Sequence, residues 1–113
     1  LHCQAESAEN TDWSQIAALY GSLSQIQPSP VVELNRAVAV AMASSPEQGL
    51  QTMERTEVAE PLQEYRWYHS ARADLLRRSG RFEEAGAAYR RALELTTNAS
   101  EIKFLEGRLA EVS

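Results

Sequence analysis

Hydrophobic residues recur at three- and four-residue steps between residues 66 and 98, which predicts two amphipathic helices. Gly80 stands where a glycine commonly follows a helix C-terminus, and the basic pair Arg77 and Arg78 precedes it in the last turn. Two glutamates then open the second helix, which is the sign favoured in a first turn. The stretch therefore predicts two helices that face each other across a short turn.

The order of residues in this helix pair resembles a tetratricopeptide (TPR) repeat, whose period is about 34 residues. The resemblance is carried by Gly80, Phe82, Ala85, Tyr89, Ala92, Leu93 and Leu95. The first helix departs from the TPR pattern, because His69 and Arg72 stand where a tryptophan and a leucine are expected. A pair of this kind cannot bury its apolar face alone, so the resemblance implies neighbouring copies.

The chain matches itself at an offset of 36 residues, which places Arg36 over Arg72 and Ala37 over Ala73. A further partial copy begins at Trp13, where the apolar spacing equals the spacing that starts at Phe82. We therefore predict an all-α fold with a TPR-like right-handed helical repeat, in which about seven antiparallel helices form one domain over residues 1–113.

Capping residues indicate where these helices begin and end. Thr11 or Asp12 can cap a helix that starts at Trp13 and ends before Pro28. The next helix has a serine cap, a proline in its first turn and almost no polar face between residues 31 and 42. We expect this helix to be the central and most buried element.

Three further elements complete the expected helix order. Pro46 opens a helix that we expect to end near Thr56, and a connector follows over residues 57–61. Asn98 and Glu101 form the start of a last helix, in a pattern close to a capping box.

The charge balance argues against a nucleic-acid-binding surface on this chain. It carries 16 acidic and 11 basic residues, for a net charge of -5, whereas phosphate neutralisation requires an excess of Lys and Arg. One cysteine, Cys3, cannot form an internal disulfide, and no apolar run approaches a membrane span, so we expect a cytoplasmic protein. The first nine residues read like the end of a helix, and we interpret the chain as a C-terminal fragment of a longer protein.

Neither a metal site nor a catalytic constellation is indicated. His2 and Cys3 do not supply the four ligands that zinc usually takes. There is no glycine-rich phosphate loop and no recognisable Ser/His/Asp motif. We therefore expect no enzymatic activity, no metal and no cofactor.

Two equivalent arginines, Arg36 and Arg72, lie on otherwise apolar rows. A buried guanidinium needs a carboxylate or carbonyl partner, so we expect an ion pair or a helix-end contact within the domain. The alternative is a paired receptor for a carboxylate of a partner peptide.

The TPR resemblance implies an inner groove lined by the first helix of each repeat. The candidate partner-binding residues are Leu34, Arg36, Val38, Met42, Trp67, Ser70, Arg72, Asp74, Arg77 and Arg78. The apolar members of this set could instead pack beneath another part of a longer chain, since an exposed patch of that size is unusual.

Three segments together resemble the C-terminal extension of a group of bacterial extracytoplasmic-function (ECF) sigma factors: SAENTDWSQIAALYGSL, PSPVVELNRAVAVAMASSPEQGL and ARADLLRRSGRFEEAGAAYRRAL. The resemblance implies a regulatory role in transcription initiation, through contacts with the sigma core of the same chain, RNA polymerase or a signalling protein. It implies no direct DNA binding by this segment, which contains no basic recognition helix. A generic TPR scaffold unrelated to transcription remains the alternative, and an enzyme is the least favoured class.

Overall fold

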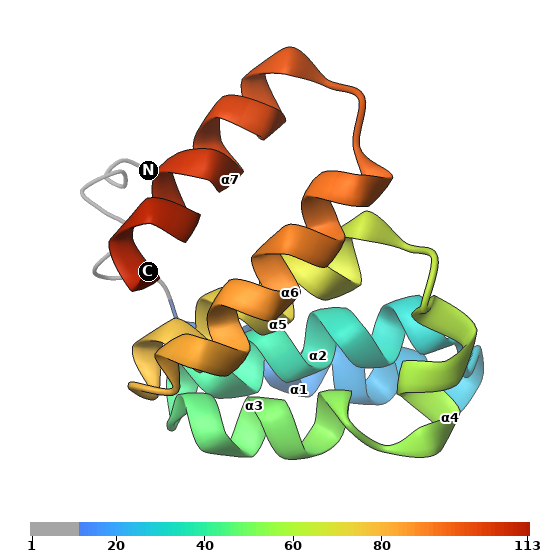
Figure 1. The fold of residues 1–113 in the computed structure, drawn as a ribbon. Coiled ribbons are helices and arrows are strands. Elements are labelled where there is room, and N and C mark those ends of the chain that lie inside the picture. Colours follow the sequence, from blue (N-terminus) through green and yellow to red (C-terminus); the bar gives the residue numbers. More distant parts are fainter. Residues whose placement is uncertain (1–11) are drawn as a thin grey trace, which may run out of the picture.

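All regular elements in the computed structural model, which describes residues 12–113, are helical (Figure 1). The helices are α1 (Trp13–Ile26), α2 (Pro30–Ala43), α3 (Pro46–Met53), α4 (Thr56–Ala59), the 3-10 helix η2 (Glu60–Leu62), α5 (Arg66–Arg78), α6 (Phe82–Leu95) and α7 (Ala99–Val112). The prediction of an all-α chain is confirmed for this part. None of the described helices is both long and apolar enough to cross a lipid bilayer.

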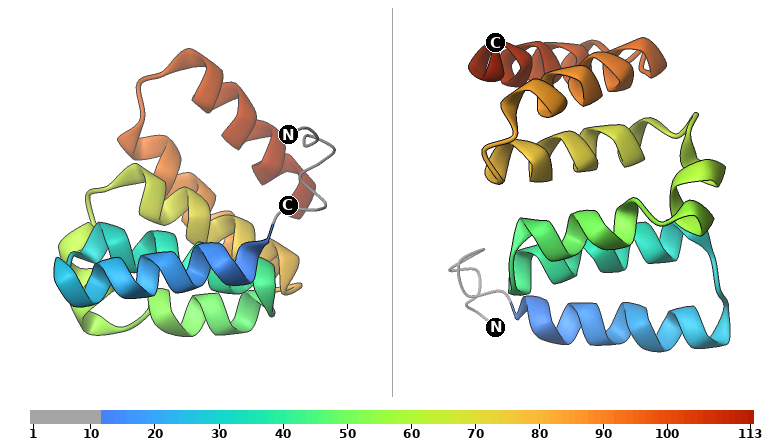
Figure 2. Two further views of the ribbon diagram at one scale, coloured as in Figure 1. Left: turned by 180° about the vertical axis from the view of Figure 1, so that it is seen from behind. Right: turned by 60° about the horizontal axis from the view of Figure 1, so that its bottom comes forward.

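The long helices form a stack in which each one packs mainly against its neighbours in the sequence. Successive long helices reverse direction, so that α2, α5 and α7 run the same way (Figures 1 and 2). α5 lies in the middle of the stack, with α2 and α3 on one side and α6 on the other (Figure 2). α7 packs on α6 at one end of the stack, and α1 packs on α2 at the other.

The capping residues lie at the helix boundaries that the sequence predicts. Asp12 accepts a hydrogen bond from the Gln15 amide at 3.1 Å, and Ser29 Oγ accepts one from the Val31 amide at 3.2 Å. Gly80 adopts a φ of 79°, the left-handed conformation that glycine takes most readily after a helix.

Asn98 caps α7, but the predicted capping box is only half formed. Its side chain accepts a hydrogen bond from the Glu101 amide at 2.9 Å. The reciprocal bond from the Asn98 amide goes to Thr96 Oγ1 at 3.2 Å instead of to Glu101. The Glu101 carboxylate is thereby free to contact other helices.

The segment predicted as a connector over residues 57–61 is helical, and α3 ends at Met53, earlier than expected. Val58 and Leu62 are both buried in the core, at 1% and 5% exposure, which favours coiling over an extended loop. Pro61 lies in the first turn of η2, where its missing N–H costs nothing.

Positions related by the 36-residue offset occupy equivalent places in the core. Ala37 and Ala73 are both fully buried, and Met53 and Tyr89 are buried to within 1%. Gly49 lies where α3 crosses α2, because a Cβ there would stand 2.7 Å from the Ala37 carbonyl oxygen. The two helices therefore touch backbone to backbone at this glycine.

The prediction that the helix of residues 31–42 is the most buried element is wrong. α5 contains six buried residues, whereas α2 contains four. Both helices have packing partners on two sides, but α1, which packs on α2, contributes no buried residue, and Val31, Val38 and Met42 of α2 are only half-buried.

Candidate partner-binding surface

Three helices that run in the same general direction, α2, α5 and α7, contribute side chains to one side of the stack. We call this surface the α2–α5–α7 face and define it by Asn35, Met42, Arg66, Trp67, Ser70, Asp74, Arg77, Arg78, Glu101 and Phe104. Along α5, Trp67, Asp74 and Arg78 follow at positions i, i+7 and i+11, which places them on one row of the helix. Trp67 Nε1 donates to Asn35 Oδ1 at 3.3 Å, so α5 is joined to α2 across this face.

An apolar hollow of about 310 Å³ lies between α5 and α7. Its lining residues are Arg66, Trp67, Ser70, Ala92, Glu101, Phe104 and Leu105. Ala92 and Leu105 are buried, whereas Trp67 and Phe104 remain 42% and 57% exposed. Two large aromatic side chains thus stand half in water beside a space that the described part of the chain leaves unfilled.

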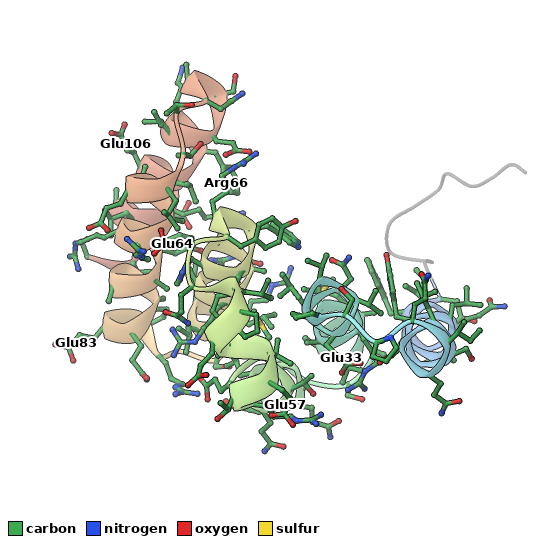
Figure 3. The ribbon with its side chains drawn as sticks, turned by 90° about the vertical axis from the view of Figure 1, so that its right-hand side faces the viewer. Glu33, Glu57, Glu64, Arg66, Glu83 and Glu106 are labelled. Carbon is green, nitrogen blue, oxygen red and sulfur yellow. The ribbon has the colours of Figure 1, made fainter. Side chains whose placement is uncertain are left out.

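A bidentate ion pair joins the beginnings of α5 and α7 at one end of the hollow. Arg66 Nε lies 2.7 Å from Glu101 Oε1, and Arg66 Nη2 lies 3.1 Å from Glu101 Oε2. Thr96 Oγ1 donates a further hydrogen bond to Glu101 at 2.7 Å. The bonds from Arg66 and Thr96 hold the pKa of the Glu101 carboxyl below its ordinary value, so the pair is charged at neutral pH. In Figure 3, Arg66 lies between the ends of α5 and α7.

The other end of the face is cationic. Asp74 is shared by two arginines, at 2.7 Å from Arg77 Nη2 and 3.3 Å from Arg78 Nε. Arg77 also donates to the Tyr89 hydroxyl at 3.3 Å, and Arg78 Nη1 lies 3.3 Å from the Met42 sulfur. Since two guanidinium groups share one carboxylate, this end of α5 carries an excess positive charge.

Six of the ten candidate residues meet on this face: Met42, Trp67, Ser70, Asp74, Arg77 and Arg78. Leu34 does not, because its side chain is fully buried in the core. The expectation that Leu34 lines an open groove is therefore wrong. Val38 is half-buried, packs against the same core and lies between Asn35 and Met42 on one row of α2.

Arg36 and Arg72 lie away from the α2–α5–α7 face. Arg36 Nη2 pairs with Glu33 at 2.9 Å beside α1, and Arg72 Nη2 pairs with Glu54 at 3.0 Å. The prediction that each arginine meets a carboxylate within the domain is confirmed. The idea that they form one receptor for a carboxylate is wrong, because they line two separate hollows.

The Glu33 carboxylate accepts hydrogen bonds from Ser24 of α1, which joins the two helices, and from Arg36 within α2. Burial acts to raise the pKa of Glu33, but these bonds outweigh it and lower that pKa overall.

A second, polar hollow of about 300 Å³ contains His69 and Tyr68 on the side of α5 that carries Arg72. Tyr68 donates to the Met53 carbonyl at 3.0 Å, and His69 Nε2 lies 2.7 Å from the Gln63 carbonyl oxygen. Burial lowers the pKa of His69, and the nearby positive charge of Arg91 acts in the same direction. Because these polar groups already have hydrogen-bond partners within the protein, we assign them a role in stabilising the fold and do not assign a binding site to this hollow.

No group of three or more His, Cys, Asp or Glu side chains within residues 12–113 is placed to hold a metal ion. The disfavoured pair His2 and Cys3 lies outside the described residues.

Sequence reasoning missed four contributors to the face: Asn35, Arg66, Glu101 and Phe104. In α7, Ile102, Leu105, Leu109 and Val112 follow at three- and four-residue steps, and Phe104 lies outside this apolar row. A phenylalanine outside the apolar row of an amphipathic helix was the available signal.

The comparisons with known proteins find a relative whose function is itself uncharacterized. The chain is 47% identical over 109 residues to an uncharacterized protein of Rhizobium meliloti (strain 1021). The match covers 96% of this chain and 25% of the relative, so the chain spans a quarter of that protein's length. No family model matches the chain, and no solved structure matches it.

Proposed function

We propose that this chain is a TPR-like interaction domain that regulates an ECF sigma factor of RNA polymerase. The observation that carries the proposal is the α2–α5–α7 face, where Trp67 and Phe104 stand 42% and 57% exposed at an apolar hollow. Half-exposed aromatic residues around a hollow are typical of the centre of a protein interface. A binding role is therefore favoured over a catalytic one.

The TPR-like part of the proposal is supported by the self-match of the sequence at an offset of 36 residues and by the equal burial of matched positions. Ala37 and Ala73, 36 residues apart, are both fully buried in helices that run in the same direction. In a helical-repeat protein each repeat contacts its neighbours, and the first helices of successive repeats line a common face. We assign α2, α5 and α7 to those positions.

The link to transcription is supported by the resemblance of three segments to the C-terminal extension of ECF sigma factors. The relative from Rhizobium meliloti fits this interpretation, because the homologous segment makes up 25% of a longer chain. We propose that the partners are a sigma core, RNA polymerase or a signalling protein, and that the protein is cytoplasmic. The net charge of -5 supports a protein partner instead of promoter DNA.

A binding experiment with a matched control tests the interaction role. This chain is immobilised, and purified RNA polymerase core and the remaining three quarters of the Rhizobium relative are passed over it separately. We expect at least one of them to bind, and we expect Trp67→Ala and Phe104→Ala to weaken that binding about tenfold or more. Phe82→Ala is the control, since Phe82 is 51% exposed on α6 and does not line the hollow. Failure of both to bind would refute RNA polymerase and the sigma core as partners.

A transcription assay tests the sigma-factor part independently. The full relative and a version without its homologous quarter are each added to RNA polymerase core on promoter templates. We expect the full protein to direct transcription and the shortened protein to show altered output at equal concentration. If the full relative directs no transcription, the generic TPR scaffold replaces the sigma interpretation. Tight, salt-sensitive binding of this chain to duplex DNA would contradict the exclusion of DNA.

A further inference from the structure

We propose that the α2–α5–α7 face binds an extended peptide that carries one large apolar side chain and, about five residues away, an acidic residue. The apolar side chain enters the hollow between Trp67 and Phe104, and the acidic residue pairs with Arg77 and Arg78. This inference rests on the proposed interaction role and names the chemistry of its ligand. It does not depend on whether that ligand belongs to a sigma factor.

The hollow is suited to a single large apolar side chain. Its volume of about 310 Å³ lies at the lower limit of pockets that hold small ligands. Its floor is Ala92 and Leu105, and the two exposed rings at its mouth lose contact with water when a side chain enters.

The polar groups at the rim of the hollow already have hydrogen-bond or ion-pair partners within the protein, so they do not require a polar group on the ligand. The Trp67 indole N–H is bonded to Asn35, and Ser70 Oγ donates to the Trp67 carbonyl at 3.3 Å. Arg66 and Glu101 neutralise each other in a bidentate pair. An apolar side chain can therefore fill the space without leaving a buried hydrogen-bond donor or acceptor unsatisfied.

The charge of the α2–α5–α7 face is the reason for the second feature of the peptide, its acidic residue. The face contains Arg66, Arg77 and Arg78 against the carboxylates of Asp74 and Glu101, so it is positive in a chain of net charge -5. Glu57, Glu83 and Glu106 point outward from α4, α6 and α7, away from this face (Figure 3). An incoming carboxylate would add charge-assisted hydrogen bonds where two guanidinium groups now share Asp74.

The spacing between the two features follows from helix geometry. Trp67 and Arg78 lie eleven residues apart on one row of α5, a rise of roughly 16 Å. An extended peptide advances about 3.3 Å per residue, so about five residues span the same distance. Ser70 lies beside this path, and the Arg66–Glu101 pair closes the face beyond the hollow.

Selection from a random peptide library tests the proposal without knowledge of the natural partner. The whole chain is immobilised and exposed to phage-displayed random dodecapeptides. We expect enriched peptides to combine a Phe, Trp, Leu or Met with an Asp or Glu four to six residues away. No enrichment, or enrichment of basic or purely apolar peptides, would overturn the proposal.

Variants then assign each feature to its residues, with the leading peptide labelled for fluorescence anisotropy. We expect Trp67→Ala and Phe104→Ala each to weaken binding about tenfold and to remove the preference for the apolar residue over alanine. Arg78→Glu should remove the preference for the acidic residue over lysine and reduce the salt sensitivity of binding.

Phe82→Ala and Arg90→Ala serve as controls, because both positions are exposed on α6 and neither lines the hollow. If these controls weaken binding as much as the face variants, the peptide binds elsewhere and the proposal is wrong. A failed selection together with a positive polymerase or sigma-core interaction would refute this ligand chemistry and leave the proposed function standing.

Discussion

Replacement of Gly49 by alanine should destabilise the protein, although alanine is the better helix former. A Cβ at position 49 would lie 2.7 Å from the Ala37 carbonyl oxygen, 2.7 Å from Ala41 Cβ and 3.1 Å from Leu75 Cδ1. The first two atoms cannot rotate away, because one belongs to the backbone of α2 and the other is fixed to it. α3 must therefore move off α2 and lose packing around Leu50 and Met53.

The expected size of the effect follows from two opposing contributions. Overpacking of a core costs about 1–3 kcal/mol, and two immovable contacts place Gly49 at the upper end of that range. The gain in helix propensity from glycine to alanine is about 1 kcal/mol. We therefore expect the free energy of unfolding to fall by about 2 kcal/mol, which lowers Tm by about 8 °C in a domain of this size.

Gly107→Ala is the matched control, because it makes the same chemical change in another helix. Gly107 lies in the interior of α7, and a Cβ there meets nothing within 4 Å. Only the propensity gain remains, so this variant should be more stable by about 0.5–1 kcal/mol. Urea unfolding followed by circular dichroism measures both variants, with the slope m checking that the transition is unchanged. A Gly49→Ala protein as stable as the parent would refute the inferred backbone contact between α2 and α3.

Three further substitutions test other parts of the structure. The lowered pKa of His69 means that the folded chain binds fewer protons than the unfolded chain, so stability should fall as pH drops from about 7 to about 5. His69→Gln should remove that part of the pH dependence in urea titrations at each pH. Asn98→Ala should cost about 1 kcal/mol in the same assay, because the Glu101 amide at the start of α7 loses its cap. Val38→Asp should cost more than about 1 kcal/mol, because it brings an unpaired charge against the core.

Each of these three substitutions has its own control. His2 is present in both the parent and the His69→Gln protein, so its titration cancels, and parallel pH curves would contradict the role of His69. Asn98→Asp retains a capping oxygen and should keep most of the stability that Asn98→Ala loses. Ala87→Asp places the same charge at an exposed position of α6, and a loss as large as that of Val38→Asp would contradict the packing of Val38.

Local signals in the sequence predicted the helices well. Asp12, Ser29 and Asn98 cap the helices that they were expected to cap, and Gly80 takes the positive φ that its position required. These interactions span at most three residues, so the sequence alone contains their geometry. The offset of 36 residues likewise predicted equivalent core positions, as Ala37 and Ala73 show.

The candidate surface was harder to predict, because its pairings cross between helices. The TPR resemblance placed Leu34 in an open groove, but its side chain is fully buried in the core cluster of the fold. The partner of Arg72 is Glu54, eighteen residues earlier, and no spacing rule connects these two residues. The hollow beside Trp67 depends on how far α7 stands from α5, which depends on the packing of α6 between them.

The nearest-neighbour stacking of these helices has a consequence for how the protein opens. α5 loses its contacts only when helices on both sides of it separate, whereas α7 is held by α6 and by the Arg66–Glu101 pair. Amide hydrogens of α7 should therefore exchange with solvent through a local opening, and those of α5 only through global unfolding. Because most contacts join segments close in the sequence, the contact order is low and refolding should be fast. A gradient of exchange protection from the centre of the stack to its ends is the expected signature.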